Sequence, residues 1–109
     1  MAATELPAGE QARALDLVAY HEGAVVSRTL VNRPAATVTV FAFDEGQGLS
    51  EHTAPFDALV HVLEGHAEVV VAGAIHRLST GEMLLMPARQ PHALAARTRF
   101  KMLLTMIRS

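Results

Sequence analysis

The sequence predicts an all-β protein whose strands form a jelly roll, a sandwich or a closed barrel. After Gly23, apolar and β-branched residues occur in short runs separated by Gly, Pro, Asp or Asn, which is typical of strands joined by turns. No long helical period, repeat or linker interrupts this series. Many short strands at nearly regular spacing favour a two-sheet or barrel architecture within one domain.

The elements are expected in the following order. Residues 1–22 predict an N-terminal arm or edge segment, and residues 23–109 predict a single barrel domain. Within the arm, Glu10–Tyr20 fits either a turn of helix or an edge strand. Gly65-His66 and Gly73-Ala74 are spaced as tight hairpin turns. The strands are expected at Val25–Val31, Ala36–Phe43, Ala58–Glu64, Ala67–Ala72, Ile75–Leu78, Met83–Met86, His92–Arg97 and Phe100–Ile107.

Several expected strands are apolar on both faces. In Ala58–Glu64, both the set at even positions and the set at odd positions favour burial, unlike the pattern of a sheet with one face in water. One face can line a barrel, and the other face then needs cover. A second sheet together with a second copy of the chain would provide it, so we expect a homodimer.

Composition excludes several function classes. Nine basic and eleven acidic residues give a net charge of −2, so no basic field exists to bind nucleic acid. The chain contains no cysteine, which excludes disulfides, thiolate metal sites and a cysteine nucleophile. No apolar run reaches the roughly 18 residues of a spanning helix, and no signal peptide is visible at the N-terminus. We therefore expect a cytoplasmic protein without nucleic-acid or membrane partners.

Two segments carry glycine, histidine and proline at a distinctive spacing. Residues 46–65 read GQGLSEHTAPFDALVHVLEG, and residues 81–96 read GEMLLMPARQPHALAA. They resemble the two motifs of the cupin family, G-x5-H-x-H-x3-E-x6-G and G-x5-P-x-G-x2-H-x3-N. The fifteen residues between them are typical of small single-domain bacterial cupins with an RmlC-like fold. The resemblance implies a cupin-type jelly-roll barrel, also called a double-stranded β-helix.

The chain departs from the first motif at two of its metal ligands. In metal-binding cupins, two histidines and a glutamate of the first motif and a histidine of the second point into the barrel. Carried over by position, this chain keeps His52 and His92 but has Ala54 and Ala58 at the other two places. Strand alternation would turn the neighbour Asp57 outward, although its place at the edge of a strand leaves it as an exception to test.

The second motif differs at two further positions. Arg89 replaces its glycine, and Ala96 replaces its asparagine. The remaining histidines do not match the motifs. His61 is expected to point away from the cavity, His66 to lie in a turn, and His76 to be an ordinary strand histidine.

Two functions from different classes follow from this pattern. The first is a cupin barrel that binds a small molecule, with an incomplete metal site at His52 and His92. The alternative is a metal-dependent cupin enzyme of oxygenase, isomerase or lyase type that uses a divalent metal at the same two histidines. The expected cofactor is at most a weakly bound divalent metal such as zinc, nickel or iron. The sequence assigns no catalytic residue, and the expected partners are a small-molecule ligand and a second copy of the chain.

Overall fold

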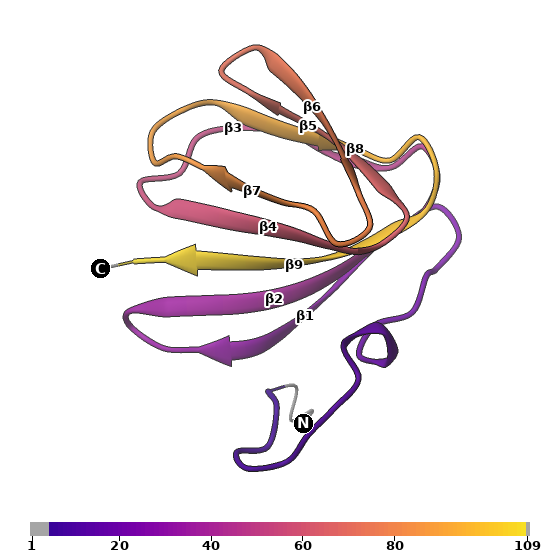
Figure 1. Ribbon diagram of the computed structural model, residues 1–109, viewed down its shortest axis with the longest axis vertical. Coiled ribbons are helices and arrows are strands. Elements are labelled where there is room, and N and C mark those ends of the chain that lie inside the picture. Colours follow the sequence, from indigo (N-terminus) through magenta and orange to yellow (C-terminus); the bar gives the residue numbers. More distant parts are fainter. Residues whose placement is uncertain (1–4, 109) are drawn as a thin grey trace.

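Nine strands provide nearly all regular structure in this computed structural model, which describes residues 5–108 (Figure 1). A single 3₁₀ turn, η1 (Ala14–Asp16), precedes them, so the ambiguous N-terminal segment contains a helical turn and no strand. The strands are β1 (Val25–Asn32), β2 (Ala36–Phe43), β3 (Gly48–His52), β4 (Asp57–Glu64), β5 (His66–Val71), β6 (Ala74–Ser79), β7 (Met83–Met86), β8 (His92–Ala95) and β9 (Phe100–Ile107).

The strands form two antiparallel sheets. The larger sheet has the order β1-β2-β9-β4-β7, and the smaller has the order β3-β8-β5-β6. Strands that are distant in sequence pair in register, as β2 does with β9 from Phe43 opposite Phe100 to Ala36 opposite Ile107. The expected all-β jelly roll is confirmed.

Alternation along each strand places one set of side chains between the sheets. On β4, Ala58, Val60 and Val62 are buried, whereas the residues between them are half-buried on the outer face. At the closed end of the barrel, the rings of Phe43 and Phe100 stack with centroids 4.5 Å apart. Twelve buried residues form this main core: Phe43, Ala58, Val60, Val62, Ala67, Val69, Leu78, Met86, Leu94, Ala96, Phe100 and Met102.

Asp44 joins three segments at this closed end. Its carboxylate accepts hydrogen bonds from the Gly23 amide at 2.6 Å and from the Arg99 guanidinium at 2.7 Å. The Gly23 hydrogen bond and, next, the Arg99 hydrogen bond lower the pKa of Asp44 to about 2. The charged carboxylate therefore ties the segment before β1 and the start of β9 to the end of β2.

Two turns differ from the sequence prediction. β4 and β5 lie in different sheets and do not pair, so Gly65 is a corner between sheets and not part of a hairpin. β5 and β6 do form a hairpin, but its central residues are Ala72 and Gly73, both with positive φ. Two consecutive positive φ angles match the twist of the flanking strands.

β3 is the strand that the sequence analysis missed. Its residues GLSEH are mostly exposed, and only Leu49 packs against the core. Pairing with β8 makes it a strand, and a Cβ at Gly48 would collide with the backbone of Leu94. Tertiary pairing with β8 therefore defines this strand, because the short polar segment has no apolar alternation of its own.

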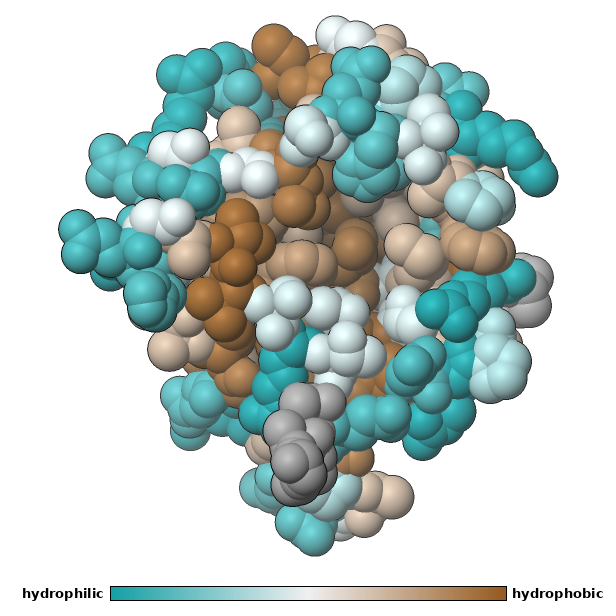
Figure 2. Space-filling model, turned by 180° about the vertical axis from the view of Figure 1, so that it is seen from behind, coloured by the Kyte–Doolittle hydropathy of each residue, from teal (hydrophilic) through white to brown (hydrophobic). Residues whose placement is uncertain are grey.

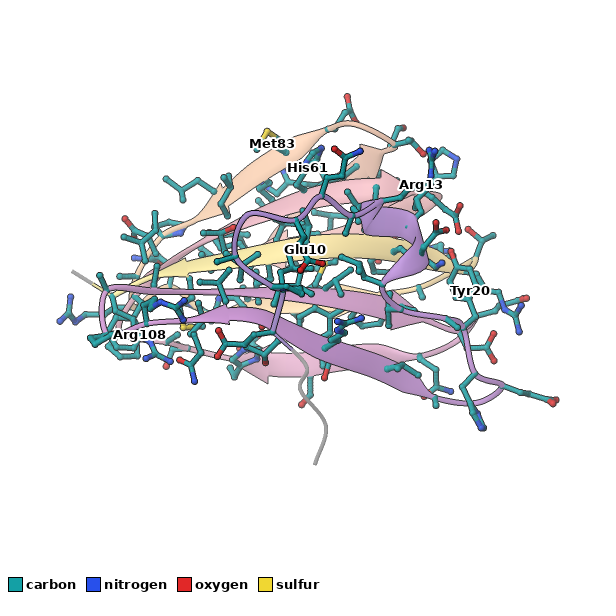
Figure 3. The ribbon with its side chains drawn as sticks, turned by 90° about the horizontal axis from the view of Figure 1, so that it is seen from below. Glu10, Arg13, Tyr20, His61, Met83 and Arg108 are labelled. Carbon is teal, nitrogen blue, oxygen red and sulfur yellow. The ribbon has the colours of Figure 1, made fainter. Side chains whose placement is uncertain are left out.

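Residues 5–22 cover part of the outer face of the larger sheet. Leu6, Leu17 and Val18 pack against a second apolar cluster that includes Val40 of β2, and Val18 is only 7% exposed. Tyr20 donates a hydrogen bond of 2.7 Å to Glu64, and burial followed by this contact raises the pKa of Tyr20. Figure 3 shows the segment crossing the sheet, with Glu10, Arg13 and Tyr20 labelled along its course. The arm thus provides part of the cover that the sequence pattern led us to expect from a second sheet and a partner.

Another part of the same face stays open. Met83 and Leu85 of β7 and Ile107 of β9 are 52%, 51% and 42% exposed. His61 of β4 pairs with Met83 across the strands, and Figure 3 shows both beyond the edge of the arm. We call Leu59, His61, Met83, Leu85 and Ile107 the outer apolar patch.

Candidate functional site

His52 and His92 lie on neighbouring strands of the smaller sheet. They are register partners across β3 and β8, and Leu49 of β3 opposes Leu94 of β8 further along. Leu94 belongs to the core, so His92, two residues before it, also faces the space between the sheets. An irregularity in β3 between Leu49 and His52 brings both of these residues to the inner face, three positions apart. The structure therefore brings the two predicted residues together.

The two imidazole rings meet through their Nε2 atoms. These atoms are 3.1 Å apart, and the ring planes are inclined by 71° with centroids 4.3 Å apart. Nδ1 of His52 lies 2.8 Å from the carbonyl oxygen of Ser50, and Nδ1 of His92 lies 3.3 Å from that of Gln90. Because a carbonyl oxygen only accepts, each Nδ1 carries the proton and donates it.

This arrangement leaves a lone pair on each Nε2 when both rings are neutral. Two facing lone pairs repel each other, and a proton or a metal cation between them removes the repulsion. A Nδ1–H group that donates to a carbonyl is also the contact that orients a metal-binding histidine. The geometry of the pair therefore allows one proton or one metal cation to lie between the two Nε2 atoms.

The two rings differ in their environment. His92 is 5% exposed, whereas the side chain of His52 is exposed. Burial lowers the pKa of His92, and the neighbouring His52 lowers it further, against the opposing effect of the Gln90 carbonyl. His92 is thus kept neutral in a buried position, while His52 opens the pair to solvent.

The donor set fits a cation held by two ligands. With zinc–nitrogen bonds of about 2.0–2.1 Å, two nitrogens 3.1 Å apart subtend an angle of about 100° at the metal, between octahedral and tetrahedral values. Within residues 5–108, no group of three or more His, Cys, Asp or Glu side chains is placed to hold a metal. The remaining positions around a cation would belong to water or to a ligand.

Ala58 and Ala54, at the motif's other two ligand positions, differ in their contacts. Ala58 is 2% exposed on the inner face of β4, opposite Met86 and Met106. The carbonyl oxygen of Ala54 accepts a hydrogen bond of 2.7 Å from the amide of Arg89. Arg89 has a φ of 66°, so the loop keeps the left-handed backbone for which the motif uses glycine.

The acidic neighbours do not complete the pair. The Asp57 carboxylate accepts a hydrogen bond of 2.7 Å from the Ala88 amide, and its register partner Ile107 lies on the outer face. Glu51 is exposed. The carboxylate of Asp57 therefore holds the loop before β8 in place.

The other histidines are separate from the pair. His61 lies on the outer apolar patch and His66 is exposed at the start of β5. His76 is half-buried and shares the inner face of β6 with the core residue Leu78, two positions further on. Its inward position follows from the register of β6, which the sequence alone did not define.

The space beside the pair is open along one side of the molecule. β1 and β3 are edge strands of different sheets and do not pair with each other. Figure 2, seen from behind, shows a hollow with an apolar floor at the centre of this side. A molecule could therefore enter between the sheets.

Known proteins resemble this chain in both sequence and structure. The sequence profile of the cupin domain matches residues 39–108. A conserved protein of unknown function from Streptococcus pyogenes is 35% identical over 95% of this chain and 91% of that chain, with a TM-score of 0.89. A cupin superfamily protein from Desulfitobacterium hafniense is 28% identical over 95% of each chain, with a TM-score of 0.88.

A third structure is similar over part of a longer chain. The cupin 2 conserved barrel domain protein from Leptotrichia buccalis is 40% identical over 85% of this chain and 45% of that chain, with a TM-score of 0.82. A comparison with curated proteins gives no match.

Proposed function

Because the chain belongs to the cupin family, we propose that it binds a small molecule between its two sheets and anchors the molecule's polar end at His52 and His92. The observation that carries the proposal is the approach of the two Nε2 atoms to 3.1 Å while both Nδ1 atoms donate to carbonyl oxygens. This geometry directs two lone pairs to one point that solvent reaches through His52.

The two histidines can anchor a ligand in two ways. One shared proton gives the pair a positive charge that suits a carboxylate or another anion. A divalent cation such as zinc, nickel or iron would instead be held by both Nε2 atoms and would polarise a bound ligand oxygen. In both cases His92 supplies a fixed, buried nitrogen and His52 supplies the exposed one.

A metal-dependent enzyme of oxygenase, isomerase or lyase type is the second candidate. The carbonyl-bound Nδ1 atoms favour it, because they fix both rings as ligands. Such chemistry also needs a base or a third ligand, and the Asp57 carboxylate is engaged with the Ala88 amide. Ligand binding without turnover is therefore the better-supported proposal.

Metal titration tests the anchor. We expect tag-free protein to bind one nickel ion per chain with an affinity in the micromolar range, since two imidazoles form only part of a coordination shell. His52→Ala and His92→Ala should each weaken binding by about tenfold or more, because each leaves a single imidazole. His66→Ala, which removes an exposed histidine outside the site, is the matched control for calorimetry. Equal affinity in all four proteins would refute the anchor.

We propose further that the protein forms a homodimer through the outer apolar patch and acts in the cytoplasm. The exposed side chains of Met83, Leu85 and Ile107 support the first statement. For the second, among residues 5–108 no helix has the length and apolar character needed to cross a membrane.

A further inference from the structure

Four hydroxyl side chains lie on the inner face of β1 and β2. Ser27 and Thr29 alternate with Val26, which packs with the arm on the outer face, and Thr37 and Thr39 alternate with Val38, which does the same. Thr29 and Thr39 are direct register partners. We call Ser27, Thr29, Thr37 and Thr39 the hydroxyl row.

The hydroxyl row contrasts with the rest of the inner face of the larger sheet. Phe41 continues the face of Thr39 along β2 and packs on the core, and Met102 and Leu104 of the neighbouring β9 are apolar. The polar residues are thus confined to one corner of an otherwise apolar face. At the three threonine positions, valine would fill the same space without a hydroxyl group, so packing does not by itself require these hydroxyl groups.

No side-chain hydrogen bond within residues 5–108 uses any hydroxyl of the row. Thr29, Thr37 and Thr39 are half-buried, and Ser27 is exposed. Hydroxyl groups in such positions pair with water or with a ligand, because leaving one unpaired costs free energy. The row is therefore available to a molecule that enters between the sheets.

The row lies where the two sheets are open to each other. β1 and β2 are the last two strands on one side of the larger sheet, and β3, which carries His52, is the edge strand of the smaller sheet on the same side. Figure 2 shows pale side chains of intermediate hydropathy beside the apolar hollow on this side. The histidine pair, the apolar floor and the row thus surround one opening.

Each of the three surfaces suits a different chemical group of a single ligand. The histidine pair suits a carboxylate, either directly or through a cation, and the apolar floor suits C–H groups. The hydroxyl row donates and accepts, so it suits hydroxyl groups. Threonines two positions apart on a strand are about 7 Å apart, and cross-strand partners about 5 Å apart, so a chain of about six carbon atoms is long enough to contact two members of the row.

We infer that the ligand is a hydroxylated carboxylic acid of about sugar-acid size, with its carboxylate at His52 and His92 and its hydroxyl groups on the row. This inference rests on the proposed function, because the histidine pair is its anchor. It adds the ligand's chemical class and assigns Thr29 and Thr39 as residues that select for hydroxyl groups.

Two acids of equal length and charge test the inference. Gluconate and hexanoate both have six carbons and one carboxylate, and only gluconate carries hydroxyl groups. We expect calorimetry to show gluconate binding to the unmodified protein about tenfold more tightly than hexanoate. In the double variant Thr29→Val, Thr39→Val, the preference should fall to within about twofold, with hexanoate affinity unchanged or higher.

A matched control distinguishes the effect of losing hydroxyl groups in the row from the effect of losing a hydroxyl group elsewhere. Thr105→Val removes a half-buried hydroxyl from the outer face of β9 and should keep the tenfold preference. Amide shifts in NMR spectra should locate gluconate, with changes near Thr29, Thr39 and His92 and none near Ile75, which is 55% exposed on β6 of the other sheet. Thermal melting of each variant verifies that it is folded.

The outcomes separate this inference from the proposed function. An equal or greater affinity for hexanoate, a preference that survives in the folded double variant, or binding of neither acid at millimolar concentration would each overturn the inference. Nickel binding that still depends on His52 and His92 would in those cases leave the proposed anchor standing. Loss of both gluconate binding and nickel binding in the His52→Ala, His92→Ala variant would support both.

Discussion

The buried ring of His92 is the most constrained residue of the candidate site. It is held neutral by burial and by the nearby His52, and its Nδ1 donates to the Gln90 carbonyl. His52, in contrast, is exposed to solvent. The division of roles between two chemically identical side chains therefore depends on their burial.

This burial predicts a pH dependence of stability. The pKa of folded His92 is lower than in the unfolded chain, so the folded state binds fewer protons between the two values. The contribution of His92 to the free energy of unfolding should be fully present above pH 6.5. It should be lost as the pH falls through 6.5 toward the lower pKa of the folded state. Urea unfolding at two pH values, one on each side of this point, would measure the loss, which should shrink in His92→Gln but persist in His66→Gln. A loss of the same size in His92→Gln would assign it to other groups.

Acid should also release any bound metal. A protonated imidazole cannot ligate, so we expect nickel bound at His52 and His92 to dissociate below about pH 6. Calorimetric titration at a series of pH values measures this directly. Retention at about pH 5, well below the usual imidazole pKa, would indicate carboxylate ligands and would contradict a site made of two histidines.

Ala54 and Ala58 offer a test of the positions taken from the cupin motif. If both face the pair, Ala54→His with Ala58→Glu should raise nickel affinity by more than the roughly 10- to 100-fold effect of one supporting contact. Ala58 is 2% exposed, so the added bulk should cost about 1–3 kcal/mol of unfolding free energy without metal. The same pair of changes in a His52→Ala, His92→Ala protein is the control. A folded double variant that binds no more tightly than the parent would show that these positions lie away from the site.

At the scale of elements, Gly65 determines how β4 passes into β5. Its φ is 83°, and an added Cβ would collide with the carbonyl oxygen of Arg99 and crowd Phe100. Gly73, in the β5–β6 hairpin, has the same φ, but a Cβ added there would meet no atom within 4 Å. One glycine is therefore needed for both backbone and space, and the other for backbone alone.

These two glycines predict unequal effects of the same substitution. Gly73→Ala should cost about 1–2 kcal/mol, the usual penalty for a side chain in the left-handed region. Gly65→Ala should cost clearly more, about 3 kcal/mol or above, because the Arg99 backbone or β5 must also move. Chemical denaturation of the two variants compares them. Equal costs would mean that the corner between the sheets relaxes easily.

The arm is held to the barrel by polar contacts as well as apolar ones. Leu6 donates its amide to the Leu30 carbonyl, and Lys101 donates to the Leu15 carbonyl at 2.7 Å. The division into an arm at 1–22 and a barrel at 23–109 stays a prediction.

At the scale of the whole molecule, the outer apolar patch predicts a dimer at micromolar concentration. Light scattering should give twice the mass of one chain. Leu85→Lys should raise the dissociation constant about tenfold or more, because it places a charge in a contact that would otherwise bury leucine. Ile75→Lys changes a residue that is 55% exposed on the other sheet and should leave the dimer intact. The mass of a single chain throughout the micromolar range would refute a dimer formed through the outer apolar patch.

Local patterning determined most of the strands and both histidine positions. Apolar runs such as those in β2, β7 and β9 define strands by themselves, because β-branched and apolar side chains favour a pleated, buried surface. Two motifs with correct spacing also identified the fold and singled out His52 and His92, which the structure brings together. The assignment of Ala54 and Ala58 to the places of two ligands stays a prediction.

Only the tertiary structure decided which faces and partners these residues have. β3 exists because β8 lies beside it, and the irregularity within it turns His52 inward next to His92. The arm, rather than a second sheet, covers Val40, and the register of β1 with β2 gathers the hydroxyl row. Such features depend on contacts between distant segments, and alternation within one segment carries no information about what another segment places opposite it.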